Sequence, residues 1–199
     1  MVYFQTNFST DGKAKKYFNW LNRQTAEAGD SADIAKNVAN TSLAEMYQTI
    51  YELRRRGLKE NDVKQFGANY STLANSRQSD ILLESGKHIE LKNKEYTSGT
   101  TPSDQEIDQV IGQKGAFGNI TTLADFEWVA FASRGNTDAD LRTMWKTVFT
   151  NKKTEIFEAM KPELRESLFG DISESKQVKE FEKLITNLDS NLYRFIKGE

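Results

Sequence analysis

The chain of 199 residues contains no cysteine, one histidine and two prolines. The lack of cysteine excludes disulfides and thiolate metal sites within the chain. The lone histidine, His88, excludes a zinc site with several histidines and is the one residue available to a histidine-dependent triad. No apolar run approaches the ~18 residues of a membrane span, and the N-terminus lacks the pattern of a signal peptide. We therefore expect no membrane partner and a cytoplasmic site of action.

The chain also has no strong excess of charge of one sign. Lysine and arginine number 27 and aspartate and glutamate 29, which gives a formal net charge of −2. A protein that holds nucleic acid by bulk electrostatics is usually basic, so strong non-specific binding is disfavoured. Local basic clusters at residues 13–16, 54–56 and 152–153 are candidate phosphate contacts. For any one cluster the favoured explanation is a solvated helix face, or charge that complements the dipole at a helix C-terminus.

Apolar spacing predicts helices over residues 11–28, 31–56, 137–160, 163–169 and 175–196. A further helix opens at Ser103, where Ser103 and Glu106 form a capping-box pattern. Strands are expected at 63–70, in a hairpin over 79–95, and at 126–132, where the residues are almost all apolar. This mixture predicts an α/β (α+β) fold.

The predicted hairpin is the stretch around which the chain is organised. Ser85-Gly86 is a turn signal between two short apolar strands. Alternation along these strands places one set of apolar residues toward a core, namely Ile81, Leu83, Ile89 and Leu91. The other face, expected on the solvent side, carries Asp80, Glu90 and Lys92.

The residues on that second face could form a metal-binding site. Two carboxylates from adjacent strands, Asp80 and Glu90, can hold a hard divalent cation such as magnesium through oxygen. Lys92 projects from the same face, where it can orient a water and offset charge on a phosphoryl oxygen. The alternative is an ordinary hairpin with a solvated charged face.

The pattern Asp80-x9-Glu90-x-Lys92 resembles the PD-(D/E)xK nuclease superfamily, which includes restriction endonucleases, repair nucleases and bacterial toxin nuclease domains. The resemblance covers residues 31–160 and implies a restriction-endonuclease-like core: a helix, three strands, a helix and a strand, with a small mixed sheet flanked by helices. The length of the chain suits one domain over residues 1–199, in which residues 1–30 and 161–199 are helical additions outside the resemblance.

The resemblance also implies residue roles. Magnesium, with manganese as a substitute, would be bound by Asp80, Glu90 and the carbonyl of Leu91, and Lys92 would position the attacking water. The helix before the sheet often carries a further acid, followed by a leucine and a closing glycine. Glu45 fits this pattern through Leu53 and Gly57.

Glu52, seven residues after Glu45, points to nearly the same side of that helix and is the competing acid. In some branches of the superfamily a glutamine on the helix after the hairpin faces the active site, and Gln109 and Gln113 are the candidates. The residues expected to contact nucleic acid are Arg54, Arg55, Arg56, Lys94, Gln109 and Arg134.

These patterns predict a magnesium-dependent endonuclease, as a restriction-type enzyme or a bacterial toxin nuclease domain, with DNA favoured over RNA as the partner. The alternatives are a toxin domain that cleaves tRNA or other RNA, and a non-catalytic domain of the same fold that binds nucleic acid or protein. A helical interaction module with incidental hairpin charges is a third. A toxin would require an inhibitor (immunity) protein, and a homodimer is one option for assembly.

Overall fold

The structure is a computed structural model that describes residues 7, 8, 12, 16, 19, 32–70 and 77–198. The chain divides into two compact units. Unit 1 takes Met1–Ala68 and Asp80–Gly86, and unit 2 takes Asn69–Ser79 and Lys87–Glu199. Among the described helices, none has the length and apolar character that crossing a membrane requires. The expectation of one domain over the whole chain stays a prediction.

Unit 1 begins, within its continuous described part, with helix α3 (Ala32–Arg55), which leads through the short 3-10 helix η1 (Glu60–Asp62) to strand β1 (Val63–Asn69). Gly57 ends the helix region at a φ of 67°, a conformation that favours glycine. The main chain of Glu84 donates a hydrogen bond to the carbonyl of Asp62 at 2.9 Å. The helix and the first strand therefore lie where the sequence predicts them.

The four strands form one mixed sheet in the order β1-β2-β3-β4, with β2 at Gln78–Leu83, β3 at His88–Lys92 and β4 at Phe126–Ala130. Strands β3 and β4 are parallel, and Glu90 is in register with Trp128. The mixed α/β fold class is thus confirmed. Strand β4 is two residues shorter than predicted, because Ala132–Arg134 turns into the 3-10 helix η3.

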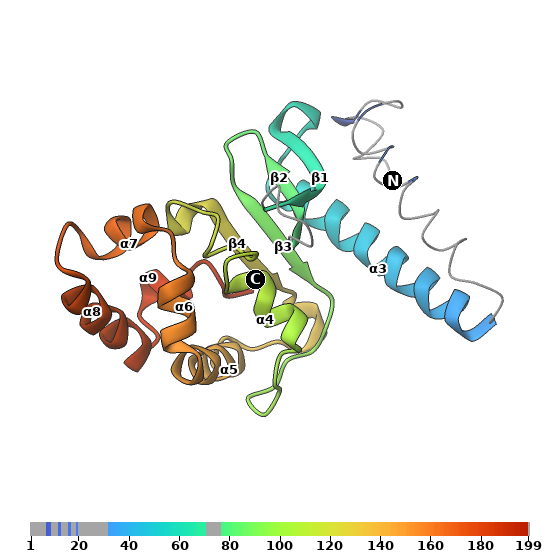
Figure 1. Cartoon of the computed structure of the whole chain (residues 1–199). Helices are drawn as coiled ribbons and strands as arrows, with labels where there is room; N and C mark the ends of the chain where they lie inside the picture. Colours follow the sequence, from blue (N-terminus) through green and yellow to red (C-terminus); the bar gives the residue numbers. More distant parts are fainter. Residues whose placement is uncertain are drawn as a thin grey trace. The chain divides into compact units, whose positions relative to one another are not determined.

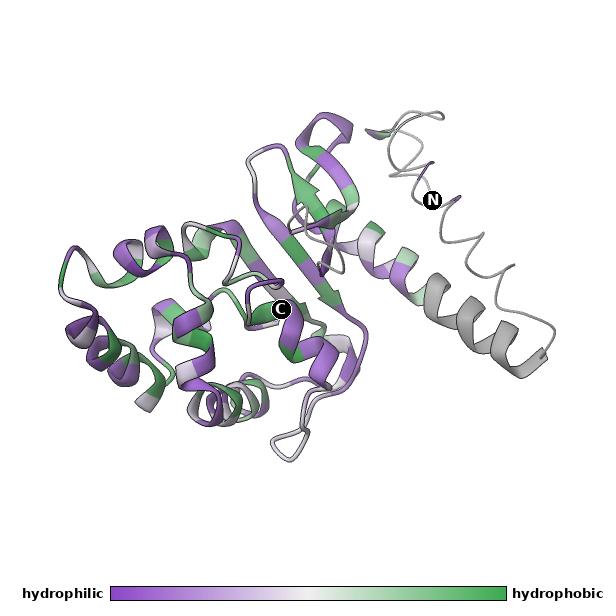
Figure 2. Ribbon diagram, viewed as in Figure 1, coloured by the Kyte–Doolittle hydropathy of each residue, from purple (hydrophilic) through white to green (hydrophobic). Residues whose placement is uncertain are grey.

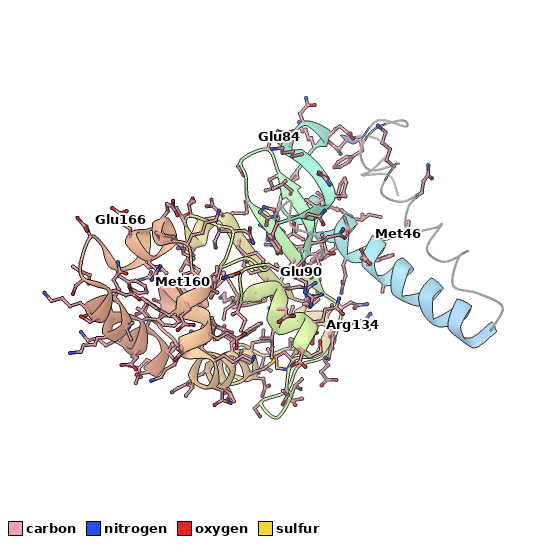
Figure 3. All side chains as sticks on the ribbon, viewed as in Figure 1. Met46, Glu84, Glu90, Arg134, Met160 and Glu166 are labelled. Atoms are coloured by element: carbon pink, nitrogen blue, oxygen red, sulfur yellow. The ribbon has the colours of Figure 1, made fainter. Side chains whose placement is uncertain are left out.

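Unit 2 places its helices around β3 and β4 (Figure 1). They are α4 (Asp104–Val110), α5 (Asp138–Asn151), α6 (Lys153–Ala159), α7 (Pro162–Phe169), α8 (Glu174–Thr186) and α9 (Ser190–Tyr193), with the 3-10 helix η2 (Leu123–Asp125) before β4. Helices α5 and α8 carry both hydrophobic and hydrophilic residues (Figure 2), as expected for helices with one buried face. Met160 is buried and Glu166 is exposed (Figure 3).

The core of unit 2 is rich in aromatic rings. Trp128 of β4 and Trp145 of α5 meet edge to face, with 5.2 Å between ring centroids, and both are fully buried. Through this contact the last strand packs against the helix that follows it. Aromatic pairs in this geometry stabilise a core beyond the area they bury.

Two long predicted helices are interrupted in the structure. The helix expected over 137–160 divides into α5 and α6 at Lys152, whose φ of −115° and ψ of 19° are not helical. The helix expected over 175–196 ends at Thr186, and Leu188 has a φ of 41°. Leu188 is completely buried, so apolar burial offsets its unfavourable backbone conformation.

The C-terminal segment runs along β4. The main chain of Trp128 donates to the carbonyl of Phe195 at 2.7 Å. A Cβ on Gly198 would lie only 1.9 Å from the carbonyl oxygen of Ala130, so that position requires glycine. Of the helix expected over 11–28, and of the basic cluster at 13–16, the structure describes only residues 12, 16 and 19.

Candidate functional site

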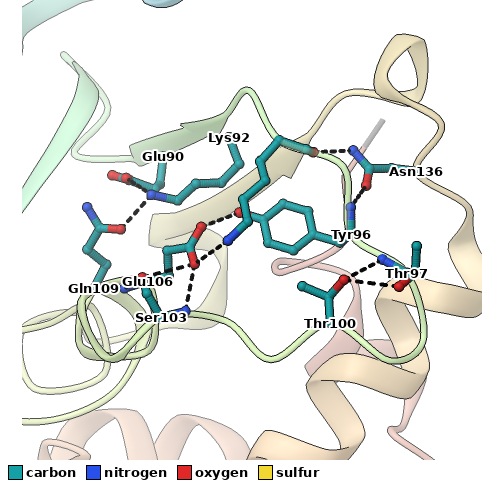
Figure 4. A network of polar contacts seen from close by, with 10 residues as sticks. Glu90, Lys92, Tyr96, Thr97, Thr100, Ser103, Glu106, Gln109 and Asn136 are labelled. Carbon is teal, nitrogen blue, oxygen red and sulfur yellow. Dashed lines mark hydrogen bonds and ion pairs between the residues drawn. The ribbon is translucent and has the colours of Figure 1, made fainter. Parts of the chain in front are cut away.

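The central contact of unit 2 joins β3 to α4. Lys92 donates from Nζ to Glu90 Oε1 at 2.5 Å and to Gln109 Oε1 at 2.5 Å. Figure 4 shows the lysine between the carboxylate and the amide. The side chain of Glu90 is 3% exposed and that of Lys92 is 13% exposed. The two charges of the Glu-x-Lys motif are therefore largely withdrawn from water, which strengthens their interaction.

Helix α4 carries Gln109 to this contact. The helix begins at Ser103, whose hydroxyl accepts a hydrogen bond from the main chain of Glu106, in the capping box that the sequence predicts. Ile107 and Val110 are buried, so the helix is fixed by its apolar face as well as by its cap. Of the two candidate glutamines, Gln109 contacts the lysine, whereas Gln113 is exposed.

Glu90 was expected on the solvent side of the sheet, and that expectation is wrong. Glu90 is in register with the fully buried Trp128, and the ring of Tyr96 packs on Trp128 at 5.2 Å between centroids. A sheet with parallel strands is commonly covered on both faces, so charged residues on it become buried. Among the predicted core residues Ile81, Ile89 and Leu91 are buried, and Leu83 is partly exposed.

A second polar cluster lies beside the first and is centred on the carboxylate of Glu106. Its Oε1 accepts from the hydroxyl of Tyr96 at 2.5 Å. Its Oε2 accepts from Lys94 Nζ at 3.2 Å and from the main chain of Ser103 at 2.8 Å. These contacts connect the chain after β3 with the first turn of α4 (Figure 4).

The ionisation of this cluster follows from its hydrogen bonds. Burial opposes the charged form of Glu106, but hydrogen bonds from Tyr96, Ser103 and Lys94 outweigh it and hold the pKa of the carboxyl below its ordinary value. Burial, followed by the hydrogen bond to Glu106, raises the pKa of the Tyr96 phenol. The carboxylate is therefore charged and the phenol neutral at neutral pH.

Asn136 fixes the chain between β3 and α4 from the side of β4. Its Oδ1 accepts from the main chain of Tyr96 at 2.7 Å. Its Nδ2 donates to the carbonyls of Lys94 and Phe131, both at 2.9 Å. A buried asparagine with its amide satisfied in this way holds two loops in one arrangement.

Two further candidate contact residues lie near this cluster. Lys94 is exposed, and besides its contact with Glu106 its Nζ lies 5.2 Å from the centroid of the Tyr96 ring. Arg134 is exposed on η3 and donates from Nε to Asn93 Oδ1 at 2.5 Å. Both cations are accessible to a charged partner.

The remaining candidates belong to unit 1. Asp80 and Glu45 are half-buried, and their grouping with Glu90 and Lys92 stays a prediction. Glu52, the competing acid, is fully buried. It accepts two hydrogen bonds from Arg55 and one from Arg56.

Those contacts separate the three adjacent arginines. Arg55 and Arg56 have side chains 31% and 17% exposed, respectively, and both are bonded to Glu52. Arg54 is exposed. The arginine run is therefore in part a structural ion cluster of the last turn of α3.

The two oxygen atoms that accept from Lys92, and the carbonyl oxygen of the adjacent residue Leu91, are of the type that a hard cation prefers as ligands. A carboxylate, an amide oxygen and a main-chain carbonyl, from Glu90, Gln109 and Leu91, are all oxygen ligands suited to magnesium. Within the described ranges, histidine, aspartate and glutamate side chains form no group of three or more that could hold a metal ion. A magnesium site here would thus need main-chain oxygen or water among its ligands, as magnesium sites commonly have.

A separate cavity of about 510 Å³ opens in unit 2. The residues that line it are Arg77, Asp108, Ile111, Gly112, Gln113, Lys114, Glu155, Glu158 and Ala159. Arg77 is paired with Asp108 at 2.6 Å. The lining does not include Glu90, Lys92 or Gln109, so the cavity is distinct from the contact between β3 and α4.

Comparisons with protein-family models, curated proteins and solved structures find no match for this chain. The sequence does not reveal the cluster of Tyr96, Glu106 and Asn136, because its members are up to 40 residues apart. The capping box is the one local signal, and it marks Glu106 as a helix-start residue without indicating Tyr96 as its partner.

Proposed function

We propose that the chain is a metal-dependent endonuclease that hydrolyses phosphodiester bonds in nucleic acid, with DNA preferred. The setting would be that of a restriction-type enzyme or a bacterial toxin nuclease domain. The observation that carries the proposal is the contact of Lys92 with both Glu90 and Gln109. The order of elements, α3-β1-β2-β3-α4-β4, supports it, because it follows the helix, three strands, helix and strand of a restriction-endonuclease-like core.

The roles follow from the chemistry of each group. Glu90, with Asp80 and the carbonyl of Leu91, would hold magnesium, and Glu45 would contribute a further acid. A bound magnesium ion supplies charge stabilisation to the phosphoryl group. Lys92 would donate a hydrogen bond to the attacking water or to a phosphoryl oxygen, and Gln109 would fix the direction of its ammonium group.

Of the basic residues predicted to contact the nucleic-acid backbone, the accessible ones are the best candidates. Arg54, Lys94 and Arg134 are exposed and suit phosphate contacts, whereas Arg55 and Arg56 are engaged by Glu52. Phosphate contacts of this kind make binding weaken steeply with salt.

Incubation of the purified protein with magnesium and, separately, plasmid DNA and total tRNA tests the proposal. We expect nicked and linear plasmid, and no cleavage in excess chelator or by Glu90→Gln. Cleaved tRNA beside intact plasmid would reverse the choice of DNA. Cleavage of neither would favour a non-catalytic domain that binds nucleic acid or protein.

A further inference from the structure

Helix α4 touches the chain of β3 and its extension at two places. The first is the contact of Gln109 with Lys92 at 2.5 Å. The second is the contact of Glu106 with Tyr96 at 2.5 Å and with Lys94 at 3.2 Å. Glu106 and Gln109 are three residues apart and therefore neighbours on one face of the helix. The two contacts thus act on the same side of α4.

The second contact has a fixed anchor. The Tyr96 side chain is fully buried, its ring lies edge to face on Trp128, and its main chain is held by Asn136. Its hydroxyl can therefore move little relative to β4. The carboxylate that accepts from it is charged at neutral pH, and a charged acceptor makes the hydrogen bond stronger.

On the helix side the first contact is anchored through the main chain, where the carbonyl of Gln109 accepts from the main chain of the buried Ala116 at 2.9 Å, but its side chain is less fixed. Gln109 has a long side chain with several rotamers and is half-exposed. Helix α4 has only seven residues, so its own hydrogen bonds fix it weakly. The buried Ile107 and Val110 hold the apolar face of α4, so the direction of the Gln109 amide on its other face depends further on how firmly the first turn of α4 is attached.

We propose that Glu106 is a positioning residue, which attaches α4 to Tyr96 and Lys94 and so holds the Gln109 amide against Lys92. The role of this contact in catalysis rests on the proposed function, whereas the contact itself does not. Glu106 acts through Gln109 and does not touch the reacting atoms. Since α4 depends on this attachment, loss of the carboxylate loosens the contact at Lys92.

NMR on magnesium-free protein tests the contact directly. The chemical shifts of the Gln109 side-chain amide are compared between the protein with Lys92 and the Lys92→Met variant, in the wild-type background and in each Glu106 variant. We expect a clear shift in the wild-type background, at least a twofold smaller shift in Glu106→Ala, and a nearly full shift in Glu106→Gln. Glutamine at this position can keep the capping hydrogen bond from the main chain of Ser103 through its one oxygen, while its NH2 group donates to the Tyr96 hydroxyl.

Ser103→Ala is the matched control. It removes the hydroxyl of the helix cap but leaves Tyr96 and Lys94 on Glu106, so the Gln109 shift should stay near its wild-type size. An equal loss in Ser103→Ala and Glu106→Ala would overturn the proposal, since the effect would then be that of any weakened helix start. An unchanged shift in Glu106→Ala would overturn it as well. Tyr96→Phe provides a second variant if Glu106→Ala does not fold.

A kinetic measurement extends the test to catalysis. Glu106→Ala should lower kcat on the order of tenfold with little change in KM, as loss of an orienting partner does. Gln109→Ala should lower it similarly, and the double variant should be no worse than either. If the wild-type protein cleaves nothing, the proposed function fails while the NMR result still decides the role of Glu106.

Discussion

Glu52 and Glu90 are both buried glutamates paired with cations, yet their surroundings differ. Glu52 is bonded to two arginines that follow it by three and four residues at the C-terminal end of α3. Glu90 is bonded to a lysine two residues on, and that lysine is shared with an amide from another element. Burial alone therefore does not distinguish a structural carboxylate from a candidate catalytic one. The partners do.

Arginine and lysine differ in how readily they change hydrogen-bond acceptors. Arginine stays charged at any ordinary pH and holds a carboxylate through two parallel hydrogen bonds, as Arg55 does with Glu52. The lysine ammonium is a compact charge on a flexible chain and can turn from one acceptor to another. In the proposed function, Lys92 would turn from Gln109 to a phosphoryl oxygen and keep its bond to Glu90. The Glu52 cluster has no such freedom.

The largest expected effect is that of Lys92→Ala on cleavage. We expect the rate to fall on the order of 10³-fold, because in the proposed function Lys92 is the charged group that acts on the reacting phosphoryl. The free energy of unfolding should also fall, by about 1–3 kcal/mol, because the buried Glu90 loses its lysine. Rates with plasmid DNA and urea unfolding measure the two effects.

The variant Glu90→Gln with Lys92→Met separates these two effects. It removes both charges together, so stability should return toward that of the wild type while cleavage stays at or below the level of Lys92→Ala. Cleavage by this double variant above the level of Lys92→Ala would contradict the assigned roles.

The second prediction concerns the Glu52 cluster. Replacing both Arg55 and Arg56 by alanine leaves a fully buried carboxylate without its cations, so the free energy of unfolding should fall by about 3–5 kcal/mol. Cleavage by the molecules that remain folded should be unchanged. Arg54→Ala is the control, with a change in stability within about 0.5 kcal/mol. Equal stability of the double variant and the control would show that water reaches Glu52.

The sequence predicts the Glu90 cluster better than the Glu52 cluster. Turn signals and alternation locate β2 and β3, and the capping box locates α4, so Lys92 and Gln109 are found as candidates. The run of three arginines suggests a binding surface, because composition does not show that the buried Glu52 takes two of them. The carboxylate with which an arginine or lysine pairs depends on which acids are buried. A single sequence predicts burial only for apolar residues, through their periodicity.

The limits on the fold have the same origin. Continuous apolar spacing predicts one helix from 137 to 160 and another from 175 to 196, since periodicity does not register a single residue that leaves the helical conformation. Lys152 and Leu188 do so, and Leu188 is fully buried in the core. Tertiary packing, which periodicity does not capture, decides those two breaks.

The third prediction concerns a substitution that would hold Lys92 more tightly, as the arginines are held in the Glu52 cluster. Gln109→Glu would place Lys92 between two carboxylates, so the lysine should leave its acceptors less readily. We expect cleavage to fall about tenfold with stability at neutral pH unchanged or slightly raised. Gln113→Glu, on an exposed residue after the same helix, should change neither. A rate for Gln109→Glu equal to that of the wild type would mean that the amide does not direct the lysine.

The smallest expected effect concerns Glu106, a carboxylate that is less buried than Glu52 and accepts from Tyr96, Lys94 and Ser103. Hydrogen bonds hold its pKa below the ordinary value of 4.5 against the effect of burial. The folded pKa is depressed, so the stabilisation is fully present above that ordinary value and is lost as the pH falls through the folded pKa. At pH 7, Glu106→Gln should lower the free energy of unfolding by no more than about 1 kcal/mol, because the site is partly solvated. Urea unfolding at steps from pH 7 to pH 3 should show this difference shrinking only below about pH 4.5.

Asp104→Asn is the control for a general loss of charge, because Asp104 is an exposed acid in the same turn of the helix. If its stability has the same pH dependence as that of Glu106→Gln, the hydrogen bonds from Tyr96, Ser103 and Lys94 are not the cause.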